Sequence, residues 1–146
     1  MILAIIMAAI LIAVCTAIHY GVLKFSSQFV TPSRHPGHCL GVAVASIVLA
    51  HILEALLYAT GFWIAVHNFQ VGDLVSSSSN GSASLTFMDY FYFSLVNYTT
   101  LGRGDLMPNG HLRFMTAMAA FHGFLLITMS GTFVLQIMNG KKPLAN

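Results

Sequence analysis

The chain alternates between long apolar segments and short polar ones. Residues 2–23 carry no charge, residues 40–66 are apolar apart from His51 and Glu54, and residues 112–138 form a third apolar stretch. Each segment reaches the ~20 residues that an α-helix needs to cross the hydrocarbon core of a bilayer. The pattern therefore predicts three transmembrane helices.

The first apolar segment has two interpretations, a secretory signal peptide or a transmembrane helix. No basic residue precedes it, and no small-x-small cleavage site follows it. Signal peptides normally show both features. We therefore expect an N-terminal transmembrane helix within residues 1–24, followed by a cytoplasmic linker over residues 25–39.

A shorter segment, residues 87–100, is rich in aromatic residues and leads into a glycine-containing loop. It follows a serine-rich stretch within residues 67–85, which we expect to be a polar, flexible loop. The segment is too short to span the bilayer, so it is predicted to be re-entrant, surrounded by protein or water. The expected fold class is an all-α membrane protein with three transmembrane helices and one re-entrant helix and loop.

Composition supports a membrane protein. Of 146 residues, 57% are hydrophobic and 7% charged, against roughly 25% charged in average soluble domains. The net charge of +2 is too small to suggest a nucleic-acid partner. The position of the basic residues is more informative, because Lys24, Arg34, Lys141 and Lys142 fall in the linker and the C-terminal tail. The positive-inside rule then predicts a cytoplasmic C-terminus and an external N-terminus.

 We expect the protein to be located in the plasma (inner) membrane.

Residues 99–105 read Thr-Thr-Leu-Gly-Arg-Gly-Asp. This motif resembles the selectivity filter of tetrameric potassium channels, whose usual form is Thr-Thr-Val/Leu-Gly-Tyr-Gly-Asp. The resemblance to this potassium-channel pore-domain family, the two-transmembrane pore-loop ion channels, covers residues 40–138. It implies an outer helix over 40–66, a pore helix over 87–100, a filter over 99–105, an inner helix over 111–138 and a cytoplasmic tail over 139–146.

The resemblance also implies a function and a set of partners. The chain would form a homotetrameric pore in the lipid bilayer, with K⁺ or another monovalent cation as the permeant ion, no enzymatic activity and no cofactor. Two other functions stay open: a non-conducting membrane scaffold or accessory subunit with a channel fold, and a metal-binding or metal-transporting membrane protein.

The residue types suit an ion filter. An ion that enters a membrane must exchange its water shell for protein oxygens, and backbone carbonyls of four such loops can supply them. Carbonyls that point at one axis require alternating backbone conformations, some with positive φ, which glycine adopts readily. The short helix before the loop directs the negative end of its dipole toward the pore. One chain cannot close such a ring, so a tetramer is expected.

The resemblance assigns roles to individual residues by position. The filter comprises Thr100, Leu101, Gly102, Arg103 and Gly104, with Asp105 just outside it. The residues that support the filter are Tyr92, Phe93, Val96 and Thr99. The gate and cavity residues of the inner helix are Gly123, as the hinge, with Phe124, Ile127 and Gly131 on the cavity-facing side.

Arg103 departs from the family pattern, because it stands where the family has tyrosine or phenylalanine. Four unpaired guanidinium groups near the filter would be costly to bury and would repel entering cations. One interpretation is an arginine that faces outward and leaves the carbonyl ladder intact. Others are a collapsed, wider or poorly selective filter, and a protein that does not conduct.

Ionisable residues also occur inside the predicted spans. His51 and Glu54 are three residues apart and share a helix face, and His122 of the third span is expected at a similar depth. These residues could form a structural hydrogen-bonded pair, a counter-charge for Arg103, a metal site, or a proton sensor. His19, His67 and His111 lie nearer the ends of the predicted spans and are expected at the membrane interface.

Overall fold

The computed structural model describes residues 1–30, 36–76, 85–102 and 104–144. Four helices and two short strands occur in these residues. In chain order they are α1 (Ile2–Gln28), α2 (Pro36–His67), β1 (Leu74–Ser76), α3 (Phe87–Tyr98), β2 (Leu106–Pro108) and α4 (Leu112–Met138).

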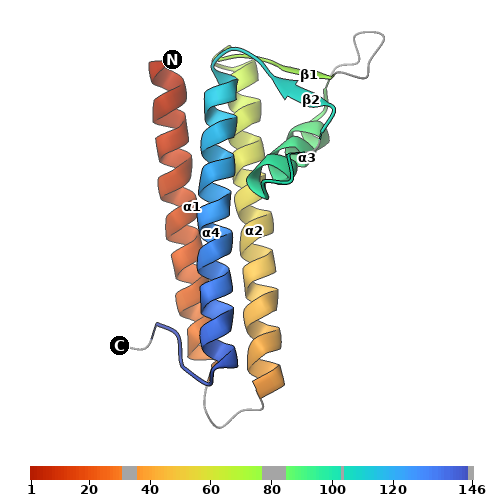
Figure 1. Cartoon of the computed structure of the whole chain (residues 1–146). Coiled ribbons are helices and arrows are strands. Elements are labelled where there is room, and N and C mark those ends of the chain that lie inside the picture. Colours follow the sequence, from red (N-terminus) through yellow and green to blue (C-terminus); the bar gives the residue numbers. More distant parts are fainter. Residues whose placement is uncertain (31–35, 77–84, 103, 145–146) are drawn as a thin grey trace.

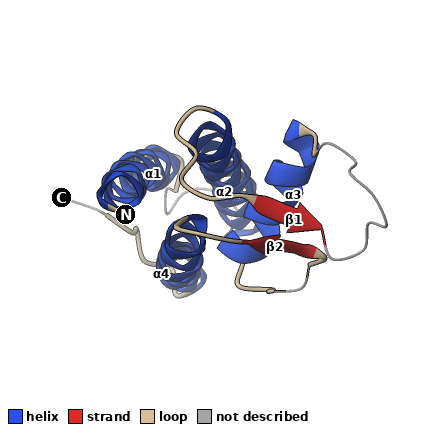
Figure 2. Cartoon of the chain, turned by 90° about the horizontal axis from the view of Figure 1, so that it is seen from above, coloured by secondary structure: helices blue, strands red, loops and turns tan. Residues whose placement is uncertain are grey.

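The three long helices lie side by side, and the short helix α3 lies against one end of them (Figure 1). Helix α1 packs against α2 and α4, and α3 packs against the same two helices. Viewed from above, α2 and α4 therefore separate α1 from α3 (Figure 2). The N-terminus lies at the end of the bundle that carries the strands, and the C-terminus lies at the opposite end (Figure 1).

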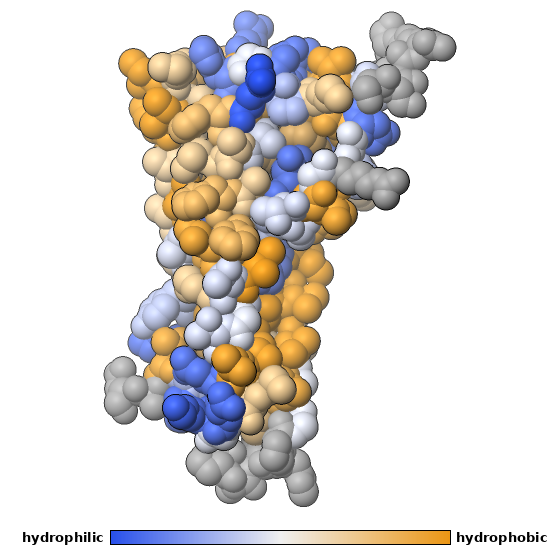
Figure 3. Space-filling view, in the orientation of Figure 1, coloured by the Kyte–Doolittle hydropathy of each residue, from blue (hydrophilic) through white to orange (hydrophobic). Residues whose placement is uncertain are grey.

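The long helices expose apolar side chains to their surroundings. All three are long and apolar enough to cross a membrane. Large side chains such as Leu49, Phe121 and Leu135 are more than half exposed. On the face shown in Figure 3, hydrophobic residues cover much of the helix length, and hydrophilic residues gather mainly near the two ends. Lipid satisfies such a surface, so the chain is an integral membrane protein of the expected all-α class.

Several helix boundaries differ from those expected from the sequence. Helix α1 continues to Gln28, and α2 begins at Pro36 rather than at residue 40, so the expected linker over 25–39 is helical at both of its ends. Proline suits the first position of a helix, because its missing N–H would have no partner there. Helix α3 ends at Tyr98 rather than at residue 100.

The two short strands were not expected from the sequence. Strands β1 and β2 pair antiparallel, with Leu74 opposite Pro108 and Ser76 opposite Leu106. The Asn109 N–H donates to the Asp73 carbonyl at 2.9 Å and extends the connection. Part of the segment predicted to be a flexible loop, residues 67–85, is therefore ordered, while residues 77–84 lie outside the described part. The pairing ties the chain before α3 to the chain after the filter loop.

Gly123 lies where α4 touches the end of α3. A Cβ atom built on Gly123 would lie 2.0 Å from the Tyr98 carbonyl oxygen, far inside van der Waals contact. Gly123 is buried, and α4 passes through it without a break. The hinge assigned to Gly123 by resemblance stays a prediction, but this glycine has a packing role that the sequence did not indicate.

Replacing Gly123 with alanine should destabilise the protein. The added methyl group must push α4 away from the Tyr98 backbone, and such overpacking costs about 1–3 kcal/mol. Thermal unfolding of the purified protein in detergent would measure the effect. Gly131→Ala is the matched control, because nothing lies within 4 Å of a Cβ at Gly131. Equal stability of both variants would contradict the packing role.

Candidate functional site

Helix α3 is fixed at its start and along its length. The Thr86 N–H and hydroxyl both donate to the Asp89 carboxylate, at 2.7 and 2.8 Å. These hydrogen bonds lower the pKa of Asp89 below its usual value. Further along, the Ser94 hydroxyl donates to the Ala55 carbonyl of α2 at 2.7 Å. Ser94 was not singled out in the sequence, although this buried contact positions the whole helix.

The loop after α3 is hydrogen-bonded back to that helix. The Thr99 hydroxyl donates to the Leu95 carbonyl at 2.7 Å, and the Gly102 N–H donates to the Val96 carbonyl at 3.3 Å. Val96, predicted to support the filter, therefore contacts Gly102 of the loop. Thr99, predicted to do the same, contacts Leu95 of α3. Their contacts hold the start of the loop at the C-terminal end of α3.

The loop backbone alternates in conformation. Thr100 has φ +57° and Gly102 has φ +61°, whereas Gly104 is not among the residues with positive φ. The expectation of positive φ is confirmed for Gly102, and Thr100 takes the second such position. A threonine in this region is uncommon, because its β-branched side chain is crowded there. Leu101 between them is 71% exposed.

A cavity of about 230 Å³ lies between α3 and the chain that follows the loop. Its lining includes Tyr92 and Phe93, the two aromatic residues predicted to brace the filter, together with Gly102 and Gly104. Phe93 is buried and meets Phe62 of α2 edge-on at 5.6 Å, whereas Tyr92 is 45% exposed. Asp105 is exposed at the end of the loop. Arg103 lies outside the described residues.

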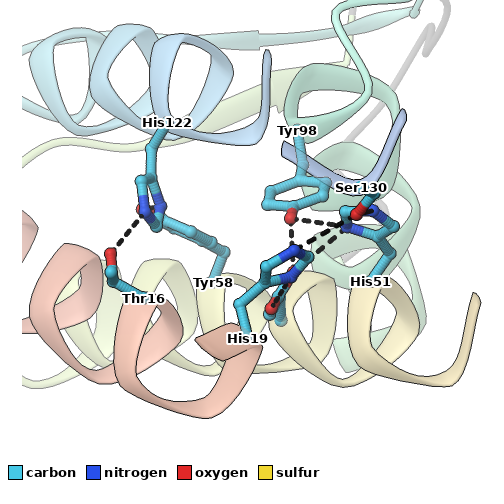
Figure 4. A network of polar contacts seen from close by, with 8 residues as sticks. Thr16, His19, His51, Tyr58, Tyr98, His122 and Ser130 are labelled. Carbon is cyan, nitrogen blue, oxygen red and sulfur yellow. Dashed lines mark hydrogen bonds and ion pairs between the residues drawn. The ribbon is translucent and has the colours of Figure 1, made fainter. Parts of the chain in front are cut away.

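A second group of polar residues surrounds the buried carboxylate of Glu54, and Figure 4 shows His19, His51, Tyr98 and Ser130 of this group close together. Glu54 accepts hydrogen bonds from His19 Nδ1 of α1 at 2.9 Å and from His51 Nδ1 of α2 at 3.1 Å. The Tyr98 hydroxyl, from the last residue of α3, donates to the same carboxylate at 2.5 Å. Both His19 and Glu54 are completely buried. Glu54 is therefore surrounded by polar groups from three different helices.

Ser130 of α4 closes the group into a ring. Its hydroxyl oxygen lies 3.1 Å from His19 Nε2 and 3.1 Å from His51 Nε2. Each imidazole thus faces Glu54 with one nitrogen and Ser130 with the other. The five residues, which we call the Glu54 ring, are His19, His51, Glu54, Tyr98 and Ser130.

The sequence paired His51 with Glu54 correctly. It grouped His122 with them, whereas the structure places His19 there. His122 makes a separate pair of contacts, with the Tyr58 hydroxyl at 2.9 Å and the Thr16 hydroxyl at 2.9 Å. His19, expected at the membrane interface, is instead 0% exposed and bonded to Glu54. The expected grouping of His51, Glu54 and His122 is therefore corrected to a grouping with His19.

A signal for His19 was present in the sequence. The buried positions of α1 include Ala4, Ala8, Cys15 and His19, which are small or polar residues at helical spacing. In a membrane helix, small residues mark the face that packs against other helices. His19 lies on that face, so its burial follows from the stripe rather than from its distance to the helix end.

The residues expected to line a cavity lie on the outer surface of the single chain. Phe124 is 55% exposed and Ile127 is 38% exposed, and Gly131 has no neighbour within 4 Å of a Cβ. Their exposure leaves them free to meet lipid or other copies of the chain. The cavity itself stays a prediction, since it requires several chains.

Comparisons with known proteins identify the family. A family model described as "Ion channel" matches residues 41–139, which span α2 to the end of α4. The chain is 33% identical over 94 residues to the uncharacterized membrane protein YdjJ of Bacillus subtilis (strain 168). That alignment covers 64% of this chain and 27% of the relative. No solved structure matches the chain. The chain belongs to the ion-channel family, as the filter motif indicated.

Removing the Glu54 carboxylate should strongly destabilise the bundle. Glu54→Ala leaves His19, His51 and Tyr98 without their shared acceptor, and each buried polar group left unsatisfied costs about 1–3 kcal/mol. Glu54→Gln keeps the size and one acceptor oxygen and should lose less. Thermal unfolding in detergent would compare both with Asp89→Asn, which changes a partly exposed carboxylate. A Glu54→Ala protein as stable as Asp89→Asn would show that the ring does not stabilise the fold.

Proposed function

We propose that this member of the ion-channel family assembles as a homotetramer and conducts monovalent cations, K⁺ among them. Four copies would place their loops, residues 100–104, around one axis. The backbone of this loop carries the proposal: alternate residues, Thr100 and Gly102, have positive φ at the end of a pore helix. Alternation of this kind directs successive carbonyl groups toward one side, where they can replace the water around an ion.

The exposure of the loop supports assembly. Leu101 is 71% exposed and Tyr92 is 45% exposed, although both belong to a segment embedded against the bundle. A chain that buried these groups against its own helices would not need partners. Neighbouring copies could cover them and complete the ring of carbonyls, and a closed ring requires rotational symmetry.

The distribution of basic residues supports an orientation in the membrane. Lys24 near the end of α1 and Lys141 after α4 lie at the end of the bundle opposite the strands (Figure 1). The positive-inside rule assigns that end to the cytoplasm. The N-terminus, the strand pair and the filter loop would then face the outside of the plasma (inner) membrane.

Arg103 is expected to reduce conduction relative to the tyrosine of related filters. Four positive charges close to the ion path repel cations, and the repulsion is strong where little water screens it. We propose a cation pore of lower K⁺ conductance and altered selectivity rather than a protein without a pore.

Replacing Gly102 with alanine should reduce ion flux without unfolding the chain. A Cβ at Gly102 would have ample space, with its nearest neighbour 3.9 Å away, but φ is +61°. A left-handed conformation costs an alanine roughly 1–2 kcal/mol, so the carbonyl should turn away. K⁺ flux into liposomes containing purified protein should fall strongly, because each chain loses one filter carbonyl that replaces the water around the ion.

Gly21→Ala is the matched control for this flux experiment, because Gly21 lies in α1 with open space around its Cβ position. Its flux should equal that of the unchanged protein. If the unchanged protein moves no monovalent cation at all, the conduction proposal fails and the scaffold function gains support.

Replacing Arg103 with tyrosine should raise K⁺ flux and the preference for K⁺ over Na⁺. The substitution removes the four repelling charges and restores the aromatic residue of related filters. Parallel liposome assays with each cation would measure both quantities, with Arg103→Lys as the control that keeps the charge. Equal flux in all three proteins would show that the charge at this position does not limit conduction.

A further inference from the structure

We propose that the Glu54 ring is a binding site for a divalent first-row transition metal ion of the Zn²⁺ type, with His19, His51 and Glu54 as ligands and Tyr98 as the fourth. The proposal does not depend on ion conduction, because it concerns a site between the helices rather than the filter loop.

The donor atoms converge on one point. One atom each of His19, His51 and Glu54 lies within 4.8 Å of the other two. Around a tetrahedral Zn²⁺ with ligand bonds of about 2.0–2.1 Å, neighbouring ligand atoms lie about 3.3 Å apart. His19 Nδ1 lies 2.9 Å from Glu54 Oε1, and His51 Nδ1 lies 3.1 Å from Glu54 Oε2, so the two imidazoles contact different oxygens of one carboxylate. If the carboxylate binds the ion through both oxygens, each of these two contacts would lengthen by only a few tenths of an ångström to reach about 3.3 Å.

The Tyr98 oxygen supplies the fourth position and releases its proton to solvent when the ion binds, because metal binding displaces the protons of its ligands. This oxygen lies 2.9 Å from His51 Nδ1 and contacts the Glu54 carboxylate. Two imidazole nitrogens, a carboxylate and a phenol oxygen form a ligand set that suits zinc and its neighbours better than Mg²⁺ or Ca²⁺, which prefer oxygen ligands alone.

The number of protons on His19, His51 and Ser130 that are available for hydrogen bonds also favours a metal ion. With Glu54 ionised and both histidines neutral, each imidazole uses its single proton toward Glu54. Both Nε2 atoms then need a proton from Ser130, whose hydroxyl has only one. If a metal ion binds both Nδ1 atoms, the imidazole protons move to Nε2, and the two lone pairs of the Ser130 oxygen accept both.

Ser130 would then act as the partner that orients both ligands. A metal-bound histidine usually donates its second N–H to a neighbouring acceptor, which fixes the ring. One hydroxyl does this for His19 and His51 at 3.1 Å each. An additional proton on the ring would also complete its hydrogen bonds without any metal, so the experiment must separate these two states.

The site is accessible from one side. His19 and Glu54 are fully buried, but the His51 side chain is 18% exposed. An ion could enter past His51. Once bound, it would join α1 and α2 to the last residue of α3, the helix that leads into the filter loop.

The test uses the full chain, purified in detergent and stripped of metal with a chelator. Zn²⁺ binding would be measured by equilibrium dialysis, and Co²⁺ would serve as a spectroscopic probe, because tetrahedral Co²⁺ absorbs visible light much more strongly than hydrated Co²⁺. We expect one tight Zn²⁺ per chain, a tetrahedral Co²⁺ spectrum and a higher melting temperature with Zn²⁺, since a ligand that binds only the folded state stabilises it.

Glu54→Gln and His19→Gln should abolish the Co²⁺ spectrum and the Zn²⁺-dependent rise in melting temperature. Ser130→Ala should weaken Zn²⁺ binding about 10–100-fold, as expected for loss of a group that orients ligands. The control is His122→Gln, which changes a buried histidine bonded to Tyr58 and Thr16 but not to Glu54; it should bind like the unchanged protein.

Two results would overturn the proposal. The first is an unchanged protein without tight Zn²⁺ binding or a tetrahedral Co²⁺ spectrum, which would mean that the ring is held by protons alone. This result needs no variant, so misfolding of a variant cannot obscure it. The second is a Co²⁺ spectrum that survives Glu54→Gln and His19→Gln in folded protein, which would place the metal on other residues.

Discussion

The buried carboxylate of Glu54 is the constraint on which the arrangement of the four helices depends. A carboxylate away from water is costly unless other polar groups replace its hydration. Here the replacements come from α1, α2 and α3, and α4 completes the ring through Ser130. Apolar packing alone would allow these helices to slide or rotate within lipid. Hydrogen bonds to one carboxylate fix their depth and rotation together.

The contacts around Glu54 give the N-terminal helix α1 a structural role in the bundle. The family match begins at residue 41 and leaves α1 outside, which suggests a helix added to an otherwise sufficient pore module. Yet α1 provides His19 to Glu54 and Thr16 to His122. Without α1, Glu54 would lose the contact with His19 and His122 would lose the contact with Thr16. The helix is therefore a structural part of the module in this chain.

Much of the fold could be predicted from the sequence, because hydrophobic length and the filter motif are local signals. The three spans, the re-entrant helix and the family all followed from them. The strand pair could not be predicted, since Leu74 and Pro108 become neighbours only after α3 turns back. One partner of Glu54 was missed for a related reason: His19 and Glu54 belong to different helices, and their contact depends on helix rotation. Distance along a helix gives the depth of a residue but not the direction that it faces.

The contact between Gly123 and the Tyr98 carbonyl links the long helix α4 to the end of the short helix α3. The inner helix and the end of the pore helix touch through backbone atoms, without a flexible side chain between them. Backbone-to-backbone contact transmits displacement with little loss, because close-packed interiors yield very little. A bend of α4 at this level must therefore shift the end of α3 and the loop that begins there. In such a chain, a movement of α4 at Gly123 and a change of shape in the loop after α3 are one mechanical event.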